Sequence, residues 1–152
     1  MNVKLALAPL ALALAATAAL AAAPIPPNTP TPMPAVKAKM KAVVDKTSTD
    51  LFNTAGEADP ANGADQKKPD AATWARLKKD ADGLKVVADW MLNPKVGKTS
   101  EANWTKSAKD MSALSAAASK AAAAKDAKAL AQAANDLSDT CTACHKYYKK
   151  QD

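Results

Sequence analysis

Glycine and aromatic residues are scarce in this chain of 152 residues. The sequence contains four glycines, one phenylalanine, two tyrosines and three tryptophans. Proteins with many tight turns need glycine where the backbone has positive φ, so four glycines argue against a turn-rich β fold. Alanine, lysine, leucine and aspartate dominate the middle of the chain, a composition that favours helices. The length corresponds to about one domain.

Residues that commonly carry catalysis are also few. The chain has two cysteines and one histidine, and its sequence shows no Ser/His/Asp set, paired-carboxylate site or glycine-rich phosphate loop. We therefore do not expect an enzyme of those classes. Twenty-one basic and fifteen acidic residues give a net charge of +6. The lysines are spread along the chain without an aromatic and basic stripe, which indicates a solvated basic surface rather than a nucleic-acid site. An acidic partner protein is compatible with that surface.

Residues 1–23 have the features of a signal peptide. A short segment with one positive charge, Lys4, precedes an apolar run that ends in small residues at Ala23, as signal peptidase requires. The run approaches the length of a membrane span, so a membrane anchor is the alternative, but its alanine-rich second half favours cleavage. We expect export to the periplasm, no membrane span after processing, and a net charge of +5 once Lys4 is removed.

A proline-rich tether follows the predicted signal peptide. Residues 24–34 read PIPPNTPTPMP and hold six of the ten prolines, which favours an extended polyproline-like conformation. Pro34 suits the first turn of a helix. Residues 35–150 then contain four amphipathic segments, for which we predict an all-α fold, an antiparallel four-helix bundle. The sequence leaves monomer and homodimer open.

The first two segments are bounded by loop and capping residues. The first covers about residues 35–55 and stops at Gly56, where a loop rich in Gly, Pro, Asp and Asn begins. The second covers about residues 71–92 after an N-cap at Asp70. Gly83 interrupts the second segment at a cost of about 1 kcal/mol, which close approach of another helix or a ligand would explain. The residues expected to face inward are Val36, Met40, Val43, Val44, Thr47 and Leu51, then Trp74, Leu77, Ala81, Leu84, Ala88 and Met91.

The boundary between the last two segments is the least defined. The third begins near Thr99 or Ser100, and residues 116–134 contain neither Gly nor Pro. Periodicity alone therefore allows a single helix of about fifty residues, whereas Asp126 predicts a break as the N-cap of a fourth helix. The residues expected to face inward are Trp104, Ala108, Met111, Leu114 and Ala118, then Leu130, Ala134, Leu137, Cys141, Cys144 and Tyr148.

Both cysteines and the histidine lie within five consecutive residues, CTACH. Cys141 and Cys144 are three positions apart and His145 is four positions after Cys141, so the three side chains are neighbours on a helix. C-x-x-C-H is the attachment signature of c-type haem. In such a site two thioethers hold the porphyrin edge while the imidazole reaches the iron from one side. We expect one covalent haem c, with His145 as an iron ligand.

Two other uses of the C-x-x-C pair remain open. A redox-active or structural disulfide is one, but thioredoxin-like motifs lie at the start of a helix, where the helix dipole lowers the thiol pKa. Cys141 and Cys144 instead come at the end of a long helix. A zinc site is the other, and it lacks a fourth ligand nearby. Haem attachment is the favoured interpretation.

An exported chain of four helices with CTACH in the last one resembles the class II cytochromes c, the cytochrome c′ family. The resemblance covers roughly residues 33–150 and implies a four-helix bundle with haem between the helices. Family members often place an aromatic and then a basic residue three and four positions after the histidine, where Tyr148 and Lys149 stand here. The family usually has Arg at the second place, so Lys149 implies a weaker haem contact. Trp104 is similar to a tryptophan early in the family's third helix, although core packing explains it equally well.

The resemblance implies two alternatives for the iron position opposite the histidine. Cytochromes c′ leave it to an apolar side chain and bind small gases, whereas a low-spin branch supplies a methionine from the first helix. Met40 lies on the inward seam of the first segment, at the height that such a ligand needs. Met33 lies in the proline-rich segment, and Met91 and Met111 fit core positions on other helices. We expect Met40 to be the second iron ligand.

Three functions follow from these alternatives. The first, which we favour, is a single-haem electron carrier that uses His145 and Met40 and exchanges electrons with a redox partner protein. The second is a five-coordinate haem protein that binds NO or CO. The third is a thiol–disulfide protein that uses Cys141 and Cys144. The favoured interpretation predicts that the chain is not an enzyme.

Overall fold

The computed structural model describes residues 34–149, and these residues are helical apart from the loops between helices. The helical elements are α1 (Pro34–Lys39), η1 (Met40–Val44), α2 (Asp45–Ala58), η2 (Pro60–Asp65), α3 (Ala71–Met91), α4 (Ala102–Ala124) and α5 (Ala127–Tyr148). The predicted all-α fold is confirmed. The predicted signal peptide and almost all of the proline-rich tether lie outside the described residues.

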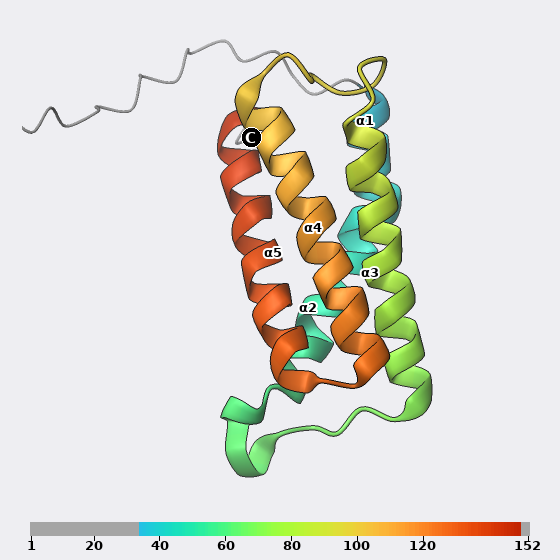
Figure 1. Cartoon of the computed structure of the whole chain (residues 1–152), viewed down its shortest axis with the longest axis vertical. Coiled ribbons are helices and arrows are strands. Elements are labelled where there is room, and N and C mark those ends of the chain that lie inside the picture. Colours follow the sequence, from blue (N-terminus) through green and yellow to red (C-terminus); the bar gives the residue numbers. More distant parts are fainter. Residues whose placement is uncertain (1–33, 150–152) are drawn as a thin grey trace, which may run out of the picture.

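The long helices pack side by side in a closed order. α3 contacts α4, α4 contacts α5, and α2 contacts both α5 and α3. Connections at the two ends of the bundle reverse the chain between successive helices, so these helices run antiparallel (Figure 1). This arrangement agrees with the predicted four-helix bundle. α1, the loop before α4 and the C-terminal end of α5 all lie at one end of the molecule, the upper end in Figure 1.

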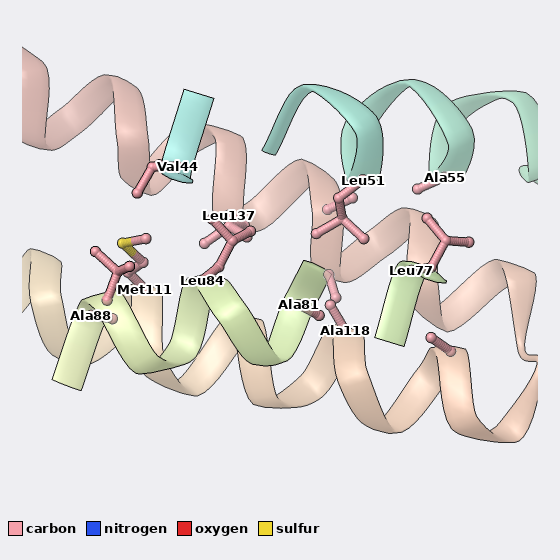
Figure 2. Close-up of a cluster of buried hydrophobic side chains, with 14 of the residues drawn as sticks. Val44, Leu51, Ala55, Leu77, Ala81, Leu84, Ala88, Met111, Ala118 and Leu137 are labelled. Carbon is pink, nitrogen blue, oxygen red and sulfur yellow. The ribbon is translucent and has the colours of Figure 1, made fainter. Parts of the chain in front are cut away.

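The core lies along the common axis of these helices. Val44 of η1, Leu84 of α3, Met111 of α4 and Leu137 of α5 point toward one another in Figure 2 and are each at most 8% exposed. Burial of one such side chain stabilises the fold by about 1.5–3 kcal/mol. Most residues predicted to face inward are buried, which confirms the helical periodicity. The exceptions, which are half-buried, are Met40, Val43, Thr47, Leu114, Cys141 and Cys144.

Two predicted N-caps are confirmed. The Asp70 carboxylate accepts a hydrogen bond from the Thr73 backbone N–H at 2.7 Å, and the Asp126 carboxylate accepts one from Ala129 at 3.0 Å. These bonds satisfy N–H groups that have no partner within their own helix. Lys125, just before Asp126, takes a left-handed conformation with φ of 56° and ends α4. The alternative of one long helix through residues 116–134 is therefore wrong.

Other sequence-based boundaries need correction. The first segment does not stop at Gly56, because α2 continues to Ala58. The third helix does not begin at Thr99 or Ser100. Its N-cap is Glu101, whose side chain makes no capping hydrogen bond. The carboxylate of Glu101 is instead directed to other partners near the end of α5, described below.

We considered that close approach of another helix would explain why a glycine, Gly83, interrupts the second helical segment. That explanation is wrong. A Cβ atom built at Gly83 meets no atom within 4 Å, so no packed helix requires a glycine there. Gly97 is different, because a Cβ would lie 1.8 Å from the Met91 carbonyl oxygen and 2.5 Å from Trp104 Nε1. Only glycine fits beside those two atoms.

None of the helices described between residues 34 and 149 has the length and apolar character of a membrane span.

Candidate functional site

The CTACH segment occupies the last two turns of α5. Cys141 and Cys144 are half-buried free thiols, on the same inward seam as the buried residues Leu137 and Tyr148. His145 follows Cys144 directly and is exposed. The predicted juxtaposition of the two cysteines and the histidine on one helix is therefore present. Cys144 packs against the hydrophobic core, Cys141 is half-buried, and the imidazole is the most exposed of the three side chains.

The surroundings of the two thiols keep them protonated. Burial raises the pKa of Cys141, and the neighbouring Cys144 raises it further. Burial also raises the pKa of Cys144, against a smaller opposite effect from a hydrogen bond with the Ser107 side chain. Each thiol loses hydration that its charged form would need. In the described structure both cysteines are poor candidates for reactive thiolates.

The same end of α5 favours the neutral imidazole. Although His145 is exposed overall, partial desolvation of its ring lowers the pKa of the imidazole, and the positive charge of Lys149 lowers it further. Lys149 is the C-cap residue of α5, and its backbone N–H donates to the His145 carbonyl oxygen at 3.1 Å. A neutral imidazole has a lone pair for a metal ion. Lys149 thus follows the turn that carries His145, and its side chain is exposed; its contact with haem remains a prediction.

Tyr148 anchors this end of α5 to the loop before α4. Its hydroxyl donates to Glu101 Oε2 at 2.8 Å, and Lys98 Nζ lies 2.9 Å from Glu101 Oε1 and 5.7 Å from the Tyr148 ring centroid. The Trp104 and Tyr148 ring centroids are 5.1 Å apart with the planes at 82°, a favourable edge-to-face pair. These contacts fix the helical turn that carries His145. Trp104 is a core residue, as the packing interpretation predicts.

The loop between α3 and α4 is itself held by Trp104. The indole Nε1 donates to the Met91 carbonyl oxygen at 2.9 Å, at the C-terminal end of α3. Gly97 lies against both of these groups, so the loop packs directly over the hydrogen bond. Sequence reasoning missed Glu101, Lys98 and Gly97, since they are distant along the chain from CTACH and belong to no motif.

Met40 lies on a local irregularity of the first helix. It begins the π-helical segment η1, in which the Asp45 N–H bonds to the Met40 carbonyl, five residues back. The Thr47 hydroxyl donates to the Val43 carbonyl at 2.8 Å and so satisfies an acceptor in the disturbed turn. Isolated π-helical turns are frequent at functional sites. Met40 is half-buried and packs against the core.

Met40 and CTACH lie at the same end of the bundle but on separate elements. η1 packs mainly against α3, whereas the contacts of the first helix with α5 come mainly from α2. The interior side of α5 at Cys141 and Cys144 therefore receives less cover from the first helix than its earlier turns do. This explains why three residues of the predicted apolar seam, Met40, Cys141 and Cys144, are only half-buried.

A surface groove of about 370 Å³ runs between α4 and α5 beside this region. Most of its lining residues carry polar side chains; they are Asn103, Lys106, Ser107, Asp110, Asp139, Thr140, Ala143 and Tyr147. Neither the cysteines nor His145 nor Met40 lines this groove, but Ser107, whose side chain interacts with Cys144, does.

Residues 34–149 contain no group of three or more His, Cys, Asp or Glu side chains that could hold a metal ion by themselves. Comparison of the chain with protein-family models, with characterised proteins and with solved structures finds no match.

Proposed function

We propose that this chain is an exported c-type cytochrome that carries electrons with one covalently attached haem. One observation supports the proposal above all. Cys141 and Cys144 lie three positions apart on the interior side of α5, half-buried and unlinked, with His145 directly after them. This is the donor set that haem c attachment uses.

The residues present fit a haem at this end of the bundle. A porphyrin is a large apolar ring, and the two thiols lie where the apolar seam of α5 is only partly covered by the first helix. Met40, Val43 and Cys144 are partly buried and pack against the hydrophobic core. Cys141 and Cys144 would hold the ring, His145 would bind the iron, and Met40 is the candidate second ligand.

The chain would contribute orientation and electrostatics to electron transfer. Bound haem supplies a one-electron Fe(III)/Fe(II) couple, which a thioether ligand poises at higher potential. Tyr148, held by Glu101 and Trp104, fixes the turn that orients the His145 ring. The apolar side chains around Met40 would exclude water from the side of the ring that faces the core.

The two other functions receive less support. A thiol–disulfide protein needs a thiolate, but burial raises the pKa of both cysteines, and the end of a helix opposes negative charge. A gas-binding haem protein would need an open iron position, and Met40 is the residue that decides between these two haem proteins. The resemblance to class II cytochromes c, the periplasmic location and the choice between monomer and homodimer remain predictions.

An absorption spectrum of the purified protein, oxidised and reduced, tests the proposal. We expect a haem spectrum whose reduced form shows the sharp bands of a c-type cytochrome. The double variant Cys141→Ala, Cys144→Ala should lose haem that survives denaturation. The matched control is Thr142→Ala, because Thr142 is exposed between the cysteines and its replacement leaves C-x-x-C-H intact. Wild-type protein without haem absorption would overturn the proposal.

A further inference from the structure

Positive charge gathers at the end of the molecule that carries CTACH. Three segments meet there, residues 34–44, 92–103 and 139–149 (Figure 1), and together they contain seven lysines but only two acidic residues. We call this surface the basic end. The segments at the opposite end, residues 56–72 and 120–130, contain five lysines and five acidic residues. Lysine is about equally frequent in the segments at the two ends, but the basic end has few acidic residues to neutralise its lysines, so its net charge is positive while that of the opposite end is zero.

Most lysines of the basic end are free to meet a partner. Six of the seven are exposed, and none of the six forms an ion pair with another residue between positions 34 and 149; they are Lys37, Lys39, Lys41, Lys95, Lys146 and Lys149. The seventh, Lys98, has a side chain 14% exposed and pairs with Glu101. Because Glu101 already binds Lys98 and Tyr148, it does little to neutralise the other lysines.

The composition of the basic end favours a protein partner over a lipid surface. Val96 and Tyr147 belong to the basic end, and Trp90 lies next to it, with its ring centroid 5.8 Å from the Lys39 ammonium. All three are partly buried, and such a mixture of aromatic and apolar groups with a polar rim suits protein interfaces. A membrane-binding helix would need an apolar face free to enter the lipid. The apolar residue of α1, Val36, is instead only 2% exposed.

We propose that the basic end docks the acidic face of a redox partner protein. This inference rests on the proposed function, which puts the haem at the same end of the bundle. Exposed charge of one sign steers an oppositely charged partner and fixes its orientation. A partner that docks here would meet the molecule close to Cys141, Cys144 and His145, where electron transfer has the shortest path.

Binding of polyglutamate to the full chain as isolated from cells tests the surface without any redox step. The test variant carries Lys37→Gln, Lys41→Gln and Lys95→Gln, which spare the proposed site residues and Lys39, whose ammonium lies 5.8 Å from the Trp90 ring centroid. The matched control carries Lys68→Gln, Lys120→Gln and Lys128→Gln, three exposed lysines near the opposite end. Both variants lose three positive charges.

We expect the test variant to bind polyglutamate about tenfold more weakly than wild type at low salt, and the control less than about twofold. Equal losses in the two variants would overturn the inference, because net charge alone would then explain binding. Tighter binding to vesicles of anionic phospholipid than to polyglutamate, lost in the test variant, would also overturn it in favour of a lipid surface.

Oxidation of the reduced protein by ferricyanide, an anion that takes one electron and becomes ferrocyanide, provides a second readout. Its rate should fall about fivefold or more between low and high salt in wild type and control, and much less in the test variant. A protein without haem would refute the proposed function while polyglutamate still reports on the surface. A protein with haem whose two variants behave alike would refute only the docking surface.

Discussion

Met40 and His145 belong to different helices. Both lie at the end of the bundle where the first helix only partly covers the apolar seam of α5. His145 is exposed beside Lys149, and Met40 is half-buried in a π-helical turn. The thioether of Met40 is a soft ligand on a flexible side chain, properties that suit a ligand of haem iron. That both residues bind the same iron remains a prediction.

The variant Met40→Ala tests whether the Met40 thioether is the second iron ligand. We expect the oxidised protein to change from low-spin to high-spin, to lose a weak sulfur-to-iron band in the far red, and to gain CO binding in its reduced form. Its reduction potential should fall, because a thioether stabilises the ferrous state. Absorption spectroscopy and a redox titration measure these changes.

Val43→Ala is the control, since Val43 lies in the same turn, is also half-buried and has no donor atom. It should leave the spin state unchanged. A wild-type protein that is already high-spin and binds CO would contradict ligation by Met40 and favour the gas-binding function.

At the level of elements, α3 contains a glycine that its packing does not require. A side chain at Gly83 would meet no atom within 4 Å, and glycine in a helix interior costs about 0.5–1 kcal/mol relative to alanine. Gly83→Ala should therefore raise the free energy of unfolding by about that amount, measured by urea denaturation of the haem-loaded protein.

Gly63→Ala is the contrasting variant. Gly63 has φ of 58° and ψ of −118°, a strained region of φ/ψ space that costs an L-residue on the order of 1–3 kcal/mol, so alanine there should lower stability. A loss of stability in Gly83→Ala would contradict the open environment seen at that position and would suggest that a ligand approaches α3 there.

The hydrogen bond between Tyr148 of α5 and Glu101 in the loop before α4 makes the stability of the fold depend on alkaline pH. Burial, together with the hydrogen bond to Glu101 and its negative charge, raises the pKa of Tyr148 well above its ordinary value. The unfolded tyrosine ionises near pH 10, while the folded one keeps its proton. The stability that Tyr148 confers is therefore complete below about pH 10 and is lost as pH rises above that value.

Tyr148→Phe should flatten the fall in stability above about pH 10 relative to wild type, in addition to lowering stability at neutral pH through the lost hydrogen bond. Tyr147→Phe retains Tyr148 and should keep the wild-type slope. Urea unfolding at a series of pH values measures both. Identical slopes in all three proteins would contradict the role assigned to the Tyr148–Glu101 bond.

Helix positions and two of their starts could be predicted from the sequence because they depend on local signals. Asp70 and Asp126 cap their helices through atoms only three residues away, and apolar spacing identifies most of the buried positions. The π-helical turn at Met40 and the contact between Glu101 and Tyr148 could not be predicted. The turn depends on packing of the whole helix, and Glu101 and Tyr148 are 47 residues apart.

At the level of the whole molecule, only part of the candidate site could be predicted from the sequence. CTACH identifies Cys141, Cys144 and His145 because their chemistry is local. The basic end is a property of the fold, since lysines from three distant segments meet only when the helices pack. The sequence therefore predicts the chemistry of the site better than the surface around it.

The mass of the intact, denatured protein isolated from the periplasm tests the central claim most directly. Denaturation removes any haem held only by iron ligation, whereas thioether bonds to Cys141 and Cys144 survive it. We predict the mass of a chain that has lost about its first 21 to 23 residues, increased by the mass of one haem. A bare polypeptide mass with two titratable free thiols would contradict covalent haem attachment.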